Sequence, residues 1–331
     1  MDRRIGAYRG GTFLNQLRGR PVNVDLIRAI AMVGVLLLHA AGRFPITPQE
    51  INQLSTLDFL RWSVVDVYQS VAVPLGVPLF LMLTGALLLQ PQKKDTLTVF
   101  FKKRWTRIGW PSVFWTSAYF AWDFLVQSIP FTAGAIAQGI LNGAYTQMWY
   151  LYLLVGLYLL TPIMRIFISH ADEGMIKYFI LIWILGVAIL PFLELFSVYR
   201  LNSNVFALTG YVGFFVLGSF LSTVHARRRT LAFFLVLGIA LTAVGTYSMA
   251  AMGIGNSMYF FQQYFSPTVI LAAVAAFLLL MTIQPATPKA DGRSSKIQKL
   301  IKCISVNTLG IFFIHVMIIE SIQLGYLGFA L

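Results

Sequence analysis

Residues 24–43 read VDLIRAIAMVGVLLLHAAGR. A helix of about 20 mostly apolar residues crosses the hydrocarbon core of a bilayer, and this stretch has that length and character. Eight more stretches are similar, so the chain has nine predicted spans: 24–43, 67–90, 108–128, 148–168, 175–196, 205–223, 231–252, 264–284 and 303–324. Barrel strands are only about ten residues long and alternate in polarity, unlike these runs. We therefore expect an all-α fold, a polytopic transmembrane helical bundle of about nine to ten spans.

The composition of the whole chain also indicates that lipid is its solvent. Of the 331 residues, 58% are hydrophobic and 11% are charged, whereas a soluble domain has about 45–50% and about 25%. The net charge of +13 comes from short basic clusters between the apolar runs, which favours membrane topology over binding of nucleic acid. Because Cys303 is the single cysteine, an intrachain disulfide is excluded and we expect no metal site.

The basic residues concentrate on alternate segments, and Lys and Arg favour cytoplasmic loops. Of the 25 Lys and Arg residues, 21 lie before span 1 or at the cytoplasmic ends of spans 2 to 9. This asymmetry predicts a cytoplasmic N-terminus and an uncleaved first span rather than a signal peptide. We predict a basic cytosolic arm over 1–23 and a single transmembrane domain over 24–331, with a polar cytosolic linker over 285–302.

Span 1 carries ionisable side chains at membrane depth, where they are costly and suggest function. Arg28 and His39 are eleven residues apart, which is three helical turns and places them on one side, about 16 Å apart along the axis. Asp25 lies three residues before Arg28 and can pair with it. A snorkelling arginine and a hydrogen-bonded structural histidine are the alternative interpretation.

Span 9 carries a second histidine, His315, at a depth similar to that of His39. The two could share one cavity, although an interhelical hydrogen bond without chemistry would also explain His315. The acidic residues Asp66 and Glu320 lie near the predicted outer ends of their spans. Solvation at the interface is the expected explanation for both.

The segment that leads into span 3 is strongly basic. Lys103, Arg104 and Arg107 are spaced by three and four residues, so they can face one side of a helix. Clustered cations at the cytosolic end of a span suit a polyphosphate ligand, because arginine binds phosphate oxygens with two hydrogen bonds. Ordinary positive-inside topology with contacts to anionic lipid is the alternative.

Several stretches, in the same order along the chain, resemble the acyltransferase-3 family of membrane-bound O-acyltransferases. The family's hallmark is an arginine in the first helix followed eleven residues later by a histidine, as in Arg28 and His39. The other matching stretches are VPLFLMLTG at 77–85, FKKRWTRI at 101–108, WYL at 149–151, LTP at 160–162, and the IS to GIFFIH stretch at 304–315. The family usually has about ten spans, and it often has a histidine where this chain has Met148.

This resemblance implies an O-acetyltransferase of the bacterial inner membrane that transfers an acyl group, commonly acetyl from acetyl-CoA, to a hydroxyl. The phosphates of acetyl-CoA would bind Arg104, Arg107 and Lys103. His39 would act as a general base or would carry the acyl group covalently, and the sequence does not choose between these roles. Arg28 would hold the donor or line the cavity, with Asp25 fixing its orientation.

On the acceptor side, the resemblance implies a hydroxyl on an envelope glycan, a lipid-linked sugar or a related molecule, and hence polysaccharide modification. His315 would orient this acceptor or stabilise the oxyanion. Trp149 and Tyr150 would line the site, because aromatic rings present flat faces to sugars and adenine. The expected partners are acyl-CoA, the acceptor and membrane lipid, without nucleic acid.

Two other functions fit the same residues. A transporter or flippase of a lipid-linked or small solute also has kinked spans and buried charges, and His39 would then be a proton relay. A membrane scaffold without enzymatic activity would leave the intramembrane arginine and histidine unexplained. Consumption of a thioester distinguishes the enzyme from both.

Overall fold

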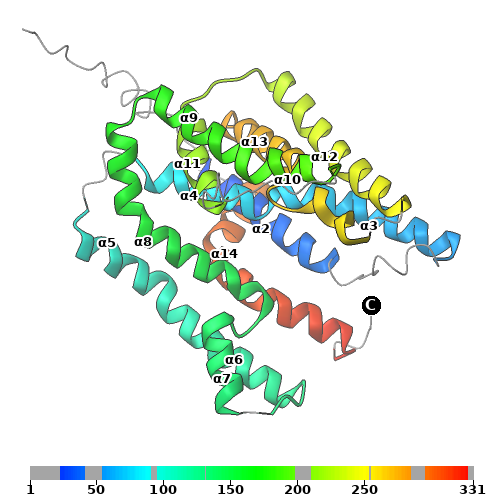
Figure 1. Ribbon diagram of the computed structural model, residues 1–331. Coiled ribbons are helices and arrows are strands. Elements are labelled where there is room, and N and C mark those ends of the chain that lie inside the picture. The colour runs from blue at the N-terminus through cyan, green and yellow to red at the C-terminus, as the bar shows by residue number, and fades with distance from the viewer. Residues whose placement is uncertain are drawn as a thin grey trace, which may run out of the picture. The chain divides into compact units, whose positions relative to one another are not determined.

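The computed structural model describes residues 23–41, 54–90, 95–130, 132–197, 210–252, 255–284 and 295–326. All regular structure in these ranges is helical (Figure 1). Nearly all of the predicted basic arm, 1–23, lies outside the described residues. The chain divides into a main unit, residues 1–90 and 171–331, and an inserted unit, residues 91–170.

Six helical segments in the described ranges are long and apolar enough to cross a membrane: Thr56–Leu88, Thr146–His170, Glu173–Glu194, Arg228–Ala251, Tyr259–Met281 and Lys296–Gln323. Each overlaps one predicted span, which agrees with an all-helical membrane protein. The three remaining predicted spans correspond to α2 (Val24–Ala41), α6 (Trp110–Leu125) and α11 (Gly210–Leu221). The described part of α11 has 12 residues, and residues 205–209 of its predicted span lie outside the described residues. The count of nine spans stays a prediction.

The core of the main unit is built around α4 (Val77–Leu88), α11 and α13 (Pro267–Met281), in which most side chains are buried. The helices α4 and α11 lie in backbone contact, and glycine makes this possible. A Cβ at Gly85 would overlap the carbonyl of Phe215, and a Cβ at Gly218 would overlap the backbone of Met82. Small residues at such positions let membrane helices approach closely.

The predicted span 67–90 is broken in the middle, at Gly76. The helix α3 (Thr56–Leu75) ends before it and α4 begins after it. Pro78 lies in the first turn of α4, where its missing N–H is not needed. The break is packed against α2, since a Cβ at Gly34 would lie only 2.9 Å from the backbone nitrogen of Gly76. Proline and glycine in this span thus produce a discontinuous helix rather than a straight one.

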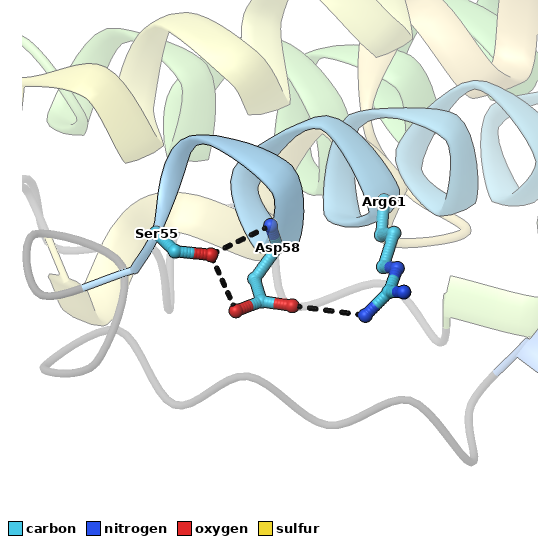
Figure 2. Close-up of polar contacts among 3 residues, drawn as sticks. All are labelled: Ser55, Asp58 and Arg61. Atoms are coloured by element: carbon cyan, nitrogen blue, oxygen red, sulfur yellow. Dashed lines mark hydrogen bonds and ion pairs between the residues drawn. The ribbon is translucent and has the colours of Figure 1, made fainter.

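The helix α3 begins eleven residues earlier than the predicted span, because its first turn is capped (Figure 2). The Ser55 hydroxyl accepts the backbone N–H of Asp58 at 3.2 Å and donates to the Asp58 carboxylate at 2.6 Å. Arg61 pairs with the other oxygen of that carboxylate at 3.2 Å. A serine cap with an acidic residue in the first turn stabilises a helix N-terminus.

The last helix, α14 (Lys296–Gln323), also begins before its predicted span and inside the predicted linker 285–302. Ser295 and Gln298 form a reciprocal capping box at its start, which satisfies two backbone N–H groups. Residues 285–294 of the predicted linker lie outside the described residues. The polar residues 295–302 therefore form the cap and the first two turns of α14 rather than a linker.

The inserted unit contains α5 (Leu97–Arg104), α6, α7 (Ala133–Asn142) and α8 (Trp149–His170). A π-helical turn, η2 (Trp105–Gly109), joins α5 to α6 without a break. Pro111 follows it in the first turn of α6 and cannot donate to the carbonyl four residues earlier, so the hydrogen-bond ladder is shifted there. The main unit repeats this pattern where η4 (Leu185–Ile189) precedes Pro191.

Candidate active site

The helices α2 and α14 pack side by side (Figure 1). As a result, α14 contacts two of the predicted catalytic residues, Asp25 near the start of α2 and His39 near its end. Near their N-termini, the Ser305 hydroxyl donates to the Asp25 carboxylate at 2.7 Å. Farther along both helices, the rings of His39 and His315 are in contact. The contacts advance in the same direction along both helices, from Asp25 with Ser305 to His39 with His315, so the two helices run parallel. This direction is consistent with first and ninth spans, which must cross the membrane the same way.

The two histidines form an edge-to-face pair. Their ring centroids lie 4.9 Å apart, and the ring planes meet at 66°. His39 occupies the last turn of α2 and is half-buried, whereas His315 is only 3% exposed. The structure thus brings together two residues that are 276 positions apart in the sequence. His39 is therefore the more exposed member of the pair.

The Nδ1 atom of His315 faces the backbone of its own helix. It lies 2.7 Å from the carbonyl oxygen of Phe312 and 3.2 Å from that of Ile311. The other ring nitrogen, Nε2, is buried and has no hydrogen-bond partner within the part of the chain that the structure describes. His315 is therefore held rigidly by one nitrogen only.

The remaining predicted residue of span 1, Arg28, is half-buried on α2. It lies eleven residues before His39, so the helical repeat places it near the stripe of α2 that faces α14. Asp25, the predicted partner of Arg28, accepts a hydrogen bond from the Ser305 hydroxyl. This contact ties the start of α2 to α14 and so helps to hold the two histidines in register.

The expectation that Asp66 is solvated at the interface is wrong, because this side chain is buried and 3% exposed. Its Oδ1 atom accepts a hydrogen bond from the Gln262 amide at 2.7 Å, and the Ser70 hydroxyl lies 3.5 Å from the same oxygen. Glu320 is also buried, at 7% exposed. No local sequence pattern signalled this burial, which involves a contact with Gln262 of η6 (Gly255–Gln262).

Loss of the Asp66 acceptor is expected to destabilise the main unit. The Asp66→Leu substitution removes the acceptor of the half-buried Gln262 amide, at a cost of about 0.5–1.5 kcal/mol, the net contribution of a typical hydrogen bond. The double variant Asp66→Leu/Gln262→Leu removes both polar groups and is expected to recover most of this loss. Denaturant titration of the purified proteins measures the difference. A single variant as stable as the double variant would contradict this coupling.

In the inserted unit, two arginines converge on the buried ring of Phe100. The guanidinium carbon of Arg104 lies 4.0 Å from the ring centroid, and that of Arg165, from α8, lies 5.0 Å from it. Arg104 also donates to the Phe100 carbonyl at 3.4 Å. Sequence reasoning did not assign Arg165 to this cluster; a lone arginine in the apolar α8 was the available signal. Two neighbouring guanidinium groups form a candidate anion site.

The other predicted cations of this segment are exposed, and one of them is already paired. Lys103 binds the Asp95 carboxylate through its Nζ atom at 3.0 Å, whereas Arg107 lies exposed in η2. The hydrogen bond from Lys103 lowers the pKa of Asp95 below its ordinary value. Folding is therefore favoured by this pair at a pH above the ordinary pKa of an aspartate, and the contribution is lost as the pH falls through the lowered value.

Removal of the Asp95 carboxylate is expected to free Lys103 for an anionic ligand. If this cluster binds the phosphates of acyl-CoA, the Asp95→Asn variant should bind CoA roughly two- to fivefold more tightly at low salt, the scale of an exposed ion pair. The gain should shrink at high salt. Calorimetric titration with CoA at two salt concentrations measures it. Unchanged affinity at low salt would remove Lys103 from the ligand site.

An apolar groove runs along the inserted unit beside Arg104 and has a volume of about 1160 Å³. Residues of α5, η2, α6, α7 and α8 line it, including Arg104, Trp105, Phe120, Ile140 and Tyr158. Its hydroxyl groups are largely engaged with backbone carbonyls, as for Ser112 with Ile108 at 2.7 Å. The groove therefore offers an apolar channel with a guanidinium group among its lining residues.

The predicted aromatic residues Trp149 and Tyr150 lie at the start of α8, next to the groove residue Met148. Their ring centroids are 6.0 Å apart and the planes meet at 79°. Trp149 is half-buried and Tyr150 is buried. They belong to the inserted unit, as do the cations, whereas the histidine pair belongs to the main unit. In the described ranges, no group of three or more His, Cys, Asp or Glu residues could hold a metal ion.

Comparison with known proteins identifies the family of this chain. The family model of the acyltransferase-3 family, described as an acyltransferase domain, matches residues 22–330. No curated protein and no solved structure matches the chain. The family match extends over both units and includes the histidine pair, the basic segment and the groove. The chain therefore belongs to the acyltransferase-3 family and is a membrane acyltransferase.

Proposed function

We propose that the protein is an O-acetyltransferase that transfers an acetyl group from acetyl-CoA to a hydroxyl of a cell-envelope glycan or a related acceptor. The observation that carries this proposal is the contact between His39 and His315, with ring centroids 4.9 Å apart inside a membrane protein of this family. Paired histidines suit proton transfer, and imidazole is the commonest general base in enzymes.

In the proposed reaction, the acceptor hydroxyl attacks the carbonyl carbon of the thioester. His39 takes the hydroxyl proton as the new C–O bond forms. The C–S bond then breaks, and the CoA sulfur receives that proton from His39. In a variant of this route, a nitrogen of His39 attacks the thioester first and carries the acetyl group to the hydroxyl. Both routes consume one thioester and release one CoA thiol.

The donor is proposed to bind the inserted unit. The phosphates of acetyl-CoA would pair with Arg104 and Arg107, assisted by Arg165 and, after release from Asp95, by Lys103. Guanidinium groups suit this role because they bind phosphate oxygens bidentately and stay charged. The apolar groove beside Arg104 would hold the pantetheine arm or the acyl chain. Trp149 and Tyr150 would offer ring faces to the adenine or to a sugar.

Topology supports a cytosolic donor. The Lys and Arg asymmetry predicts that the N-terminus and the basic segment before α6 face the cytoplasm of a bacterial cell, at its inner membrane. Acetyl-CoA is a cytosolic metabolite, and many envelope glycans lie on the other side. Arg28, held near Asp25 at the start of α2, would then hold the donor or line the path from the cytosolic side.

The proposal is tested with purified protein in lipid nanodiscs, labelled acetyl-CoA and envelope extract from cells that lack the protein. We expect stoichiometric release of CoA thiol and transfer of label to the glycan fraction. The exposed residue His225 provides a matched control, because His225→Ala removes a histidine outside the pair and should leave transfer unchanged. Directional solute flux without CoA release would support a transporter and overturn the proposal.

A further inference from the structure

The tautomer of His315 follows from its hydrogen bonds. Both neighbours of Nδ1, the carbonyls of Phe312 and Ile311, are acceptors without a proton to give. Nδ1 must therefore carry the ring hydrogen and donate it. In the neutral imidazole the other nitrogen, Nε2, is then an acceptor with a lone pair. Second hydrogen bonds of this kind set which nitrogen of a histidine can react.

The Nε2 lone pair is buried and unused among the described residues. A buried acceptor without a partner costs about 1–3 kcal/mol, and such atoms are rare in native structures unless they serve a function. A structural histidine that only joins helices would use both nitrogens. His315 instead reserves one nitrogen, in a ring that contacts the ring of His39.

His39 is the nearest ring that could supply a donor. The centroids are 4.9 Å apart, close enough that a rotation of the half-buried His39 ring about its side-chain torsions can place a ring N–H within hydrogen-bond distance of Nε2. His315 itself is too deeply buried to meet a bulky glycan. It is therefore suited to act through His39.

We propose that the two histidines form a relay in which Nε2 of His315 accepts a ring N–H of His39. This contact would fix the tautomer of His39, make its other nitrogen the base, and stabilise the ring when that nitrogen is protonated. The inference rests on the proposed function and favours His39 as a general base over an acyl carrier. His315 is then a positioning residue, as an orienting partner is for other catalytic histidines.

Every proton that moves in this reaction has a donor and an acceptor. The acceptor hydroxyl gives its proton to His39, the C–O bond forms and the C–S bond breaks. His39 returns the proton to the CoA sulfur. His315 keeps its own Nδ1 proton throughout and only accepts a hydrogen bond from His39, so no oxidant, reductant or further reactant is needed.

The first test is spectroscopic and independent of turnover. Protein labelled with ¹⁵N at histidine is expected to show one buried ring as the neutral Nδ1–H tautomer, with a signal that disappears in His315→Gln. The ¹⁵N shifts of the His39 ring should move in the same variant, because its N–H loses or changes its acceptor. An Nε2–H tautomer for His315 would overturn the proposal.

The second test is kinetic and uses matched substitutions at one position. His315→Leu removes the acceptor and is expected to lower kcat roughly 10–100-fold, the scale of an orienting partner, with an unchanged KM for acetyl-CoA. His315→Gln offers an amide oxygen in place of Nε2 and should restore part of the loss. A structural role alone predicts equal effects for both variants, or parallel changes in KM and thermal midpoint.

The two proposals fail in different ways. If the wild-type protein releases no CoA, the proposed function falls, while the tautomer of His315 is still read by NMR. If wild type transfers acetyl and His315→Leu has the same kcat, the relay falls and the function stands. Accumulation of a labelled acyl-His39 in wild type without acceptor would also overturn the relay, since His39 would then be a carrier.

Discussion

Acyl transfer is expected to fall by about 10²–10⁴-fold when His39 is replaced by alanine, the typical contribution of a positioned general base. His39 is the more accessible member of the histidine pair, and its half-buried ring lies at the end of α2. The substitution removes the proton acceptor without opening a deep cavity. The affinity for CoA should stay unchanged, because the proposed phosphate-binding residues are in the inserted unit.

The measurement is CoA thiol release and label transfer under single-turnover conditions, with CoA affinity determined separately. His225→Ala is the matched control, since His225 is exposed and its Nδ1 lies 3.1 Å from the Thr223 carbonyl. His39→Gln preserves size and a hydrogen-bonding side chain without a base, and should be as inactive as His39→Ala. Full activity in either His39 variant would contradict the assignment of this residue as the base.

A second large effect is expected at the contact between α4 and α11, where Gly85→Ala or Gly218→Ala should prevent stable folding. The added methyl group would overlap the carbonyl of Phe215 in the first case and the backbone of Met82 in the second. Overpacking of a core usually lowers the folding stability by about 1–3 kcal/mol. Because the added methyl group would clash with backbone atoms, which cannot change rotamer, we expect a loss at or above the upper end of this range. Both helices must move apart to accept either substitution.

Gly310→Ala is the control, because a Cβ at this position has no atom within 4 Å. Replacing an interior helix glycine by alanine stabilises the helix by up to about 1 kcal/mol. Thermal midpoints from fluorescence-detected gel filtration compare the three variants. Gly85→Ala or Gly218→Ala proteins as stable as Gly310→Ala would refute the close packing. The glycine that ends the VPLFLMLTG stretch is thus assigned to helix packing rather than to chemistry.

Much of this protein could be predicted from local sequence patterns. Long apolar runs require helices in lipid, because a helix alone satisfies its own backbone hydrogen bonds within one segment. The Arg28 to His39 spacing predicted that these two side chains share one side of α2. Helix starts were less accurate, since the capping by Ser55 and by Ser295 extends α3 and α14 into polar sequence.

Hydrophobic length and helical spacing are properties of single segments, so they predict a helical chain that enters a membrane, with Arg28 and His39 on one side of one helix. They do not predict that the rings of His315 and His39 are in contact, that Asp66 is buried against Gln262, or that Arg165 joins Arg104 around Phe100. These contacts depend on how separate helices pack. Packing is set by the shapes of many side chains at once, and no local pattern encodes it.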